Sequence, residues 1–384
     1  MKNIVQTMTA LIASEVCGKA IDPSQDPFSD EELAALYKLS KAHDLAHLVG
    51  DALIKNKLIS NAEIKSKFEK QLMTAVYRYE RINYELNCLR TILNDAKMPF
   101  IPLKGSIIRR YYPEPWMRTS CDIDILVREE QVDEAAQLLV DRYGYTYEKK
   151  NYHDISLMSG SGVHLELHYS IKERKDNIDS LLSECWSYAV RLEGFEYGFT
   201  NEFFLFHQFA HASYHFLGGG CGIRPFIDVF LLEKKLSFNR GKLDEMLQRT
   251  GIKKFSDEML CLANLWFGNG EHDSITRSME QFVLTGGVYG TAENSVAVSQ
   301  QKERGRIGYI LRRIWLPYDL LCTTYPRLKG RRYLQPFYEI RRWFRVFNVD
   351  ARKRKKNDLN AIKQLSPERK DNVNQMLKEL ELGN

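Results

Sequence analysis

The sequence predicts an α+β protein, in which one small mixed sheet lies between helical regions on its N-terminal and C-terminal sides. Three observations predict this class. Apolar residues recur at helical spacing through about the first hundred residues. Residues 97–175 then change to a β-α-β-α-β-β-β order, and the helical pattern returns from about residue 178.

The length and composition allow several globular domains. The 384 residues are enough for two or three domains with substantial cores, and the hydrophobic fraction of 44% excludes a disordered chain. We expect an N-terminal helical region over 1–96, a sheet-containing core over 97–175, a helical domain over 176–290 and a basic helical region over 291–384.

The sequence contains no obvious membrane or secretion segment. No stretch reaches the roughly 18 unbroken apolar residues that a spanning helix needs. Polar residues interrupt the first twenty residues, which favours an amphipathic packing helix over a secretion signal. The seven cysteines are odd in number and never spaced as CxxC, which argues against a disulfide framework and a structural zinc site. We therefore expect a cytoplasmic protein.

Further helices are predicted before the sheet. Ser29 and Glu32 form a capping-box pattern, in which the serine accepts from a first-turn amide and the glutamate reaches back, so a helix begins near residue 30. A second helix is expected over 47–56 and a long one over 62–95. The predicted buried stripe of the long helix consists of Phe68, Leu72, Val76, Tyr79, Ile82, Leu86, Leu89 and Leu93.

The core region begins with a short apolar strand at 98–103 and a strand-to-helix turn within 104–112. A second strand covers 122–127, and the amphipathic helix that follows over 129–144 ends at Gly144. Three further strands are predicted from the segments YTYEKK, YHDISLM and VHLELHYSI.

Two carboxylates lie on one face of the second strand. Side chains alternate along a strand, so Asp122 and Asp124 point to one side and the apolar residues to the other. Glu166 shares a strand face with His164 and His168 in the same way. If these strands are neighbours, three carboxylates meet, and like charges that close favour a bound cation. Hard oxygen ligands suit Mg²⁺, so the pattern predicts a two-metal phosphoryl-transfer site.

The segment Lys104-Gly105-Ser106 is a candidate phosphate-binding turn. It stands where a strand is expected to turn into a helix. Glycine lets the backbone approach a ligand, the serine hydroxyl can donate, and a helix N-terminus favours negative charge.

These motifs carry a resemblance to a known superfamily. The order LKGS, then R-x-x-x-DIDILV, then a strand with LELH resembles the polymerase-β-type nucleotidyltransferases, whose signature is a Gly-Ser turn, an Asp-x-Asp strand and a later acidic strand. More narrowly, residues 99–127 and 204–232 are similar to a family of bacterial proteins described only as uncharacterised nucleotidyltransferases. The resemblance covers roughly residues 30–350 and is sharpest at 99–127, 163–168 and 207–228.

The resemblance implies a polymerase-β-like sheet and a set of site residues. Asp122, Asp124 and Glu166 would be the catalytic carboxylates and would bind two Mg²⁺ ions. Gly105 and Ser106 would hold the triphosphate of an NTP. The 15 residues of 107–121 separate this turn from the aspartates, which is at or past the long end of the usual superfamily gap.

The implied reaction is the transfer of a nucleoside monophosphate from an NTP to an acceptor hydroxyl, with release of pyrophosphate. Asp124 or Glu166 would accept the proton of the hydroxyl, and Lys104 and Arg118 would neutralise charge on the leaving pyrophosphate. The sequence leaves the acceptor open among a nucleic acid, a small molecule and a protein side chain.

Further polar residues follow the core region. His207, His211 and His215 recur every four residues on one predicted helix, without the glutamate of zincins, so we expect packing against the core, with His211 facing the substrate cleft. Arg224 and Asp228 follow a glycine-rich turn, and they either line that cleft or form a capping ion pair.

Residues 302–356 are strongly basic, with 17 Lys and Arg against 4 Asp and Glu. Aromatic residues interleaved with arginine suit nucleic acid, and Trp- and Arg-rich helices also lie on anionic membranes. A solvated helical face explains the same pattern. Peripheral contact with a membrane or a nucleic acid is therefore an open expectation.

Two other functions are compatible with the motifs. One is a non-catalytic protein of the same fold that binds a nucleotide or docks a partner. The other is a metal-dependent phosphohydrolase that uses carboxylates with His164, His168 and His207.

Overall fold

A computed structural model of the protein describes residues 4–21, 26–173, 175–288, 290–302, 315, 316, 318, 321, 322, 325–328, 330–344 and 366–382. The chain divides into two compact units. The first contains residues 1–213 and 223–276, and the second contains 214–222 and 277–384. The predicted division into four regions stays a prediction.

The helices predicted for the N-terminal region are present. They are α1 (Ile4–Cys17), α2 (Asp30–Ala42), α3 (Ala46–Lys55) and α4 (Ala62–Asp95). The capping box that begins α2 is complete, because the Ser29 hydroxyl accepts from the Glu32 amide and the Glu32 carboxylate accepts from the Ser29 amide at 3.0 Å.

The buried stripe of α4 differs from the prediction in its middle part. Val76 is 36% exposed, and the residue that points inward there is Ala75. Phe68 packs against the Tyr37 ring of α2, with 5.1 Å between ring centroids, whereas Ile82 and the apolar residues after it belong to the core of the sheet. The middle of α4 lies between these two cores, which is why the stripe is interrupted.

The sheet has seven strands in the order β3-β4-β5-β2-β1-β7-β6. Their bounds are β1 (Phe100–Pro102), β2 (Asp122–Val127), β3 (Thr146–Lys150), β4 (Asp154–Met158), β5 (His164–His168), β6 (Ala189–Glu193) and β7 (Glu196–Phe199). The mixed sheet between helices is therefore confirmed. The expectation of helices alone after residue 178 is wrong, because β6 and β7 form a hairpin that extends the sheet through β1. The side chains of this edge hairpin are exposed or partly exposed, so its short strands gave no strong apolar signal.

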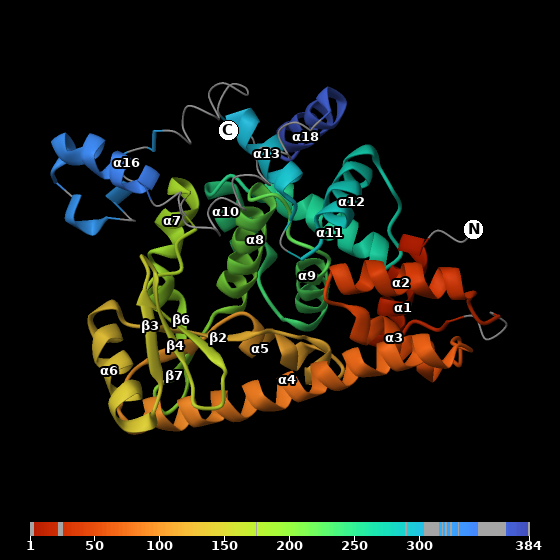
Figure 1. Cartoon of the computed structure of the whole chain (residues 1–384), viewed down its shortest axis with the longest axis horizontal. Helices are drawn as coiled ribbons and strands as arrows, with labels where there is room; N and C mark the ends of the chain where they lie inside the picture. The colour runs from red at the N-terminus through yellow and green to blue at the C-terminus, as the bar shows by residue number, and fades with distance from the viewer. Residues whose placement is uncertain are drawn as a thin grey trace. The chain divides into compact units, whose positions relative to one another are not determined.

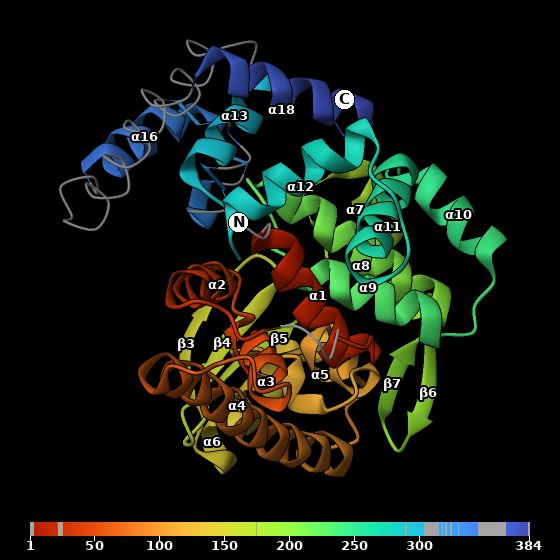
Figure 2. The same ribbon diagram turned by 90° about the vertical axis from the view of Figure 1, so that its right-hand side faces the viewer.

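One face of the sheet is apolar and covered. Alternate residues of β2, β4 and β5, among them Ile123, Ile155 and Leu165, pack with α4 and with α6 (Val132–Tyr143). Figures 1 and 2 show α4 running along this side of the strands. The carboxylates of β2 and β5 alternate with these core residues, so they lie on the opposite face of the sheet.

The other α-helices are divided between the two units. Within the first unit are α5 (Gly105–Ile108), α7 (Asp176–Leu182), α9 (Arg224–Lys235), α10 (Arg240–Arg249) and α11 (Lys253–Phe267). The helices α8 (Asn201–Leu217) and α12 (Ser274–Gly286) contribute residues to both units, and α13 (Ala292–Lys302), α16 (Gln335–Phe344) and α18 (Pro367–Glu379) belong to the second.

The basic stretch 302–356 falls largely outside the described residues. Its described part includes α16, which buries Glu339 against the Arg342 guanidinium at 2.7 Å and exposes Phe337 and Ile340. Among the described helices, none is both long enough and apolar enough to cross a membrane.

Candidate active site

The two acidic strands are direct neighbours. β2 and β5 pair in parallel, and their register sets Asp122 opposite His164 and Asp124 opposite Glu166. Because the apolar residues of both strands occupy the core face, the polar residues of both are brought together on the opposite face. The two acidic strands are thus neighbours, as a shared carboxylate site requires, and their carboxylates are directly opposite each other at Asp124 and Glu166.

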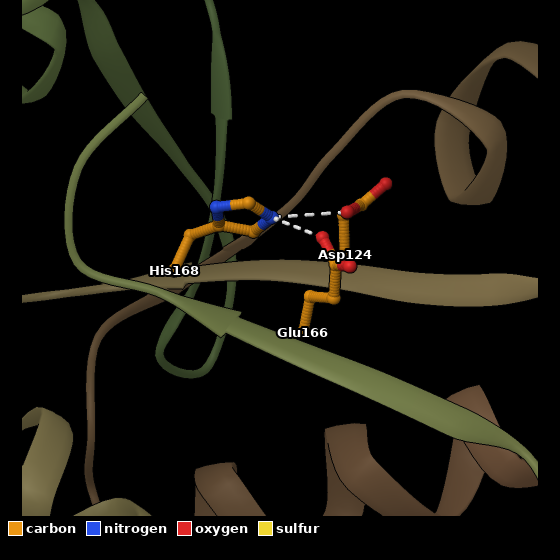
Figure 3. A group of neighbouring side chains, drawn as sticks. All are labelled: Asp124, Glu166 and His168. Carbon is orange, nitrogen blue, oxygen red and sulfur yellow. Dashed lines mark hydrogen bonds and ion pairs between the residues drawn. The ribbon is translucent and has the colours of Figure 1, made fainter. Parts of the chain in front are cut away.

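Asp124, Glu166 and His168 form a group of possible metal ligands within the described part of the chain. One ligand atom from each lies within 4.8 Å of the others. His168 Nε2 is 3.0 Å from Asp124 Oδ1 and 3.3 Å from Glu166 Oε2 (Figure 3). We call these residues the DEH cluster. Asp122 is not one of its members, so the structure combines two of the predicted carboxylates with His168, which the sequence suggested only for the phosphohydrolase alternative.

Burial and charge act in opposite directions on the DEH cluster. Burial by itself raises the pKa of Asp124, but the Lys104 ammonium and the His168 hydrogen bond outweigh it and lower that pKa. Burial lowers the pKa of His168, yet its bonds to Asp124 and Glu166 prevail and raise that pKa to about 9. The two carboxylates therefore hold a cationic imidazole in place.

Asp122 lies two residues before Asp124 on the same side of β2 and is half-buried. Burial raises the pKa of Asp122, and the negative charges of Asp124 and Glu166 raise it further. The positive charges of Lys104 and Arg118 oppose this rise in pKa without cancelling it.

The predicted turn Lys104-Gly105-Ser106 follows β1 and begins α5. The Leu103 amide donates to the Asp124 carbonyl at 2.9 Å, which ties the turn to the acidic strand. Lys104 Nζ lies 3.9 Å from Asp124 Oδ1. The buried Ser106 hydroxyl has no hydrogen-bond partner within the described structure. The turn thus brings an ammonium group and an unsatisfied hydroxyl to the end of the site.

A side chain at Gly105 would crowd its surroundings. A Cβ there would lie 3.2 Å from Ser120 Cβ and 3.3 Å from Arg118 Nη1. The absence of a side chain therefore lets Arg118 lie directly behind the turn.

Arg118 and Asp228 form a buried ion pair. Arg118 Nη2 donates to Asp228 Oδ2 at 2.9 Å and Nε donates to Oδ1 at 3.1 Å, while the Tyr112 hydroxyl donates to Oδ1 at 2.7 Å. Arg118 Nη1 also donates to the Thr119 carbonyl at 2.8 Å. The pair fixes the loop before β2 to α9, and both the predicted nucleotide-binding role of Arg118 and the predicted cleft role of Asp228 stay predictions.

The N-terminal helices also hold this loop. Asp44, between α2 and α3, accepts from the Thr119 hydroxyl at 2.9 Å and forms an ion pair with Arg224 of α9. His47 Nε2 lies 2.9 Å from the Met117 carbonyl oxygen. No sequence motif indicated Asp44, because its role depends on segments far apart in the chain.

The three histidines of α8 have different surroundings in the structure. His207 is buried, and burial lowers the pKa of His207 to about 3, to which the charges of His211 and Lys104 add. His211 Nδ1 lies 2.7 Å from the Glu173 carboxylate, and burial and the Lys104 charge keep the pKa of His211 well below its usual value. His215 belongs to the second unit. The expectation that His211 faces substrate stays a prediction.

A second layer of polar residues surrounds His168. The His153 ring stacks on the His168 ring, with 5.3 Å between centroids and an angle of 30° between planes. His153 Nε2 lies 3.1 Å from the buried Asp154 carboxylate. By contrast, His164 pairs with Glu148 of β3 at 3.2 Å and is not part of the DEH cluster.

Comparison with known families agrees with this arrangement. The model of a family described as uncharacterised nucleotidyltransferase matches residues 29–268, which include the turn, the DEH cluster and Asp228. No curated protein and no solved structure matches the chain.

Proposed function

The chain belongs to the uncharacterised nucleotidyltransferase family, and we propose that it moves a nucleoside monophosphate from an NTP to an acceptor hydroxyl. One observation carries the proposal. The parallel register of β2 and β5 sets Asp124 beside Glu166 on the sheet face opposite the apolar core, and Lys104 of the glycine-serine turn lies 3.9 Å from Asp124. Acidic ligands and a phosphate-binding turn are the two parts that such a transfer needs.

The donor atoms present fit a divalent cation. Carboxylate oxygens and an imidazole nitrogen converge within 4.8 Å, and burial with the charges of Asp124 and Glu166 raises the pKa of Asp122 despite Lys104 and Arg118. Asp122, Asp124 and Glu166 would hold Mg²⁺, with two ions as the sequence predicts. Bound ions supply positive charge against the triphosphate and make the acceptor hydroxyl easier to deprotonate.

The turn would bind the triphosphate. The Lys104 ammonium compensates phosphate charge, and the partnerless Ser106 hydroxyl donates to a phosphate oxygen. Arg118 adds positive charge from behind Gly105 while its fork stays bonded to Asp228. Its contribution is therefore electrostatic support of the turn.

In the reaction, the acceptor oxygen forms a bond to the α-phosphorus while the bond from that phosphorus to the α,β-bridging oxygen breaks. Pyrophosphate leaves with the bonding electron pair. We assign the hydroxyl proton to Glu166, because its side chain is 29% exposed whereas that of Asp124 is 8% exposed. Glu166 is thus the carboxylate that an incoming acceptor reaches more easily.

The test follows two labels of the same NTP. The protein is incubated with Mg²⁺, each of the four NTPs labelled at the α- or γ-phosphate, and an acceptor pool of bulk tRNA, extracted protein or small metabolites. We expect the α label to become acceptor-bound and the γ label to appear in pyrophosphate. Asp124→Asn should abolish both signals, whereas Asp133→Asn, which changes a 75% exposed carboxylate, should change neither.

Other outcomes would identify the other functions. Release of the γ label as orthophosphate, with no α label on any acceptor, would mean hydrolysis. Mg²⁺-dependent NTP binding without cleavage in any pool would mean a non-catalytic nucleotide-binding protein. Of the three histidines of the phosphohydrolase alternative, only His168 belongs to the DEH cluster, whereas His164 and His207 lie outside it.

The remaining expectations stay predictions. They are the acceptor class, the preferred NTP, the cytoplasmic location and a peripheral contact of residues 302–356 with an anionic membrane or a nucleic acid.

A further inference from the structure

The presence of an imidazole in the DEH cluster bears on which ion the site takes. We propose that Asp124, Glu166 and His168 form a mixed nitrogen and oxygen site that selects a first-row transition dication, such as Mn²⁺, over Mg²⁺. This proposal rests on the proposed function in one respect, which is that the ion is bound where the nucleotide transfer takes place. It adds His168 to the carboxylate ligands of the transferase site, whereas the sequence suggested this histidine only for the phosphohydrolase alternative.

The distances from His168 Nε2 to the two carboxylate oxygens suit ligands of one ion. Two ligands at right angles on a cation with bonds of about 2.1 Å lie about 3.0 Å apart. His168 Nε2 lies 3.0 Å from Asp124 Oδ1 and 3.3 Å from Glu166 Oε2. A cation bound there would displace the Nε2 proton that bridges these groups, the proton would leave to solvent, and only small movements of the side chains would be needed.

The orientation of His168 is set before any ion binds. Its side chain is 5% exposed, Nε2 points at both carboxylates and Nδ1 points away (Figure 3). The ring of His153 stacks against it, and His153 is itself held by Asp154 at 3.1 Å. A ligand fixed by its neighbours loses little conformational entropy on binding, which favours coordination by the imidazole over its displacement.

The ligand types decide between the ions. Mg²⁺ prefers all-oxygen coordination and gives up its waters reluctantly, so an imidazole adds little to its affinity. First-row transition dications accept imidazole nitrogen readily, and Mn²⁺ also accepts carboxylate oxygen. One nitrogen with two carboxylates therefore raises the affinity for Mn²⁺ more than that for Mg²⁺.

The test measures metal binding without nucleotide. Free Mn²⁺ is followed by electron paramagnetic resonance while Mn²⁺ is titrated into the intact protein, and Mg²⁺ is then added as a competitor. We expect one tight Mn²⁺ site per chain and an affinity at least about tenfold above that for Mg²⁺. His168→Gln should weaken Mn²⁺ binding by about tenfold or more and leave the Mg²⁺ affinity nearly unchanged.

His164→Gln is the matched control. His164 lies on the same strand and the same face, two residues before Glu166, but its Nε2 contacts Glu148 at 3.2 Å. This variant should bind Mn²⁺ like the parent protein. A measurement on the parent protein removes any dependence on variant folding, because pulsed paramagnetic resonance should detect the nitrogen of one coordinated imidazole.

Two results would overturn the inference. One is equal competition by Mg²⁺ and Mn²⁺ for the same site, and the other is bound Mn²⁺ without a nitrogen signal. Either result, together with intact transfer of the α label in Mg²⁺, would reject the selectivity and keep the transferase. A selective Mn²⁺ site in a protein that moves no label to any acceptor would support the metal site and reject the transferase.

Discussion

At the scale of single residues, Lys104 combines a strained backbone with a functional side chain. Its backbone angles are φ 42° and ψ −117°, a region that side-chain-bearing residues rarely occupy. Such conformations cost roughly 1–3 kcal/mol and persist where surrounding contacts impose them. Here the Lys104 carbonyl accepts from the Ile107 amide at 3.0 Å and the Ile108 amide at 2.9 Å. The strained turn holds the ammonium group beside Asp124.

Substitution of Lys104 should separate strain from charge. Lys104→Ala and Lys104→Gly both remove the ammonium, so both should weaken MgNTP binding by about tenfold or more. Glycine tolerates the positive φ, so Lys104→Gly should have a free energy of unfolding about 1 kcal/mol above that of Lys104→Ala. Equilibrium dialysis and urea unfolding measure the two effects. Equal stability of the two variants would show that the backbone there is not strained.

At the scale of elements, the loop before β2 is held from two directions. Arg118 connects it to Asp228 of α9, and Thr119 connects it to Asp44 between α2 and α3. Two segments outside the sheet, α9 and the turn between α2 and α3, therefore position the first residues of β2. Both lie within the residues that the family model matches. This explains why helices distant in sequence belong to the same unit as the site.

The Arg118–Asp228 pair should show strong coupling in a double-mutant cycle. Removing one partner of a buried pair leaves the other charge uncompensated, so Asp228→Asn and Arg118→Gln should each lower the free energy of unfolding by roughly 3 kcal/mol. The double variant should lose less than the sum of the two by about 1–3 kcal/mol.

The surface pair Arg249–Glu184 provides the matched control for this cycle. Its side chains are 53% and 46% exposed, so its coupling should stay below about 1 kcal/mol. Additive losses at Arg118 and Asp228, as at the surface pair, would show that the buried contact does not connect the loop to α9.

At the scale of the whole molecule, buried neutral histidines link folding to pH. Burial lowers the pKa of His47 to about 4, and the Met117 carbonyl bond opposes this only in part. The unfolded chain, with a histidine pKa near 6.5, binds a proton that the folded chain excludes between those values. The contribution of neutral His47 to the free energy of unfolding is therefore fully present above pH 6.5 and decreases as the pH falls toward 4.

The pH dependence should change in one variant. Glutamine can keep the bond to the Met117 carbonyl but does not titrate. On going from pH 7.5 to pH 5, His47→Gln should lose about 2 kcal/mol less unfolding free energy than the parent protein. Urea titrations at both pH values measure the difference, with His272→Gln on an exposed loop as the control. Identical slopes for parent and His47→Gln would contradict a neutral buried His47.

The sequence by itself determined the local parts of this protein. Helical spacing and the capping box located the N-terminal helices, and the alternation in DIDILV separated a core face from a carboxylate face on β2. The glycine-serine turn was also predictable, because a strand, a turn residue and a short helix follow one another directly. Each of these features depends on residues only a few positions apart.

The tertiary structure alone decided which polar groups meet. Alternation shows which face a side chain takes, but the neighbour across the sheet depends on strand order and register, which are set by contacts far apart in sequence. The parallel pairing of β2 with β5 brings His168 to Asp124, and chain folding brings Asp44 to Thr119. The place of the β6–β7 hairpin in the sheet was unpredictable for the same reason. It depends on the pairing of β7 with the edge of β1, and no local sequence pattern indicates that pairing.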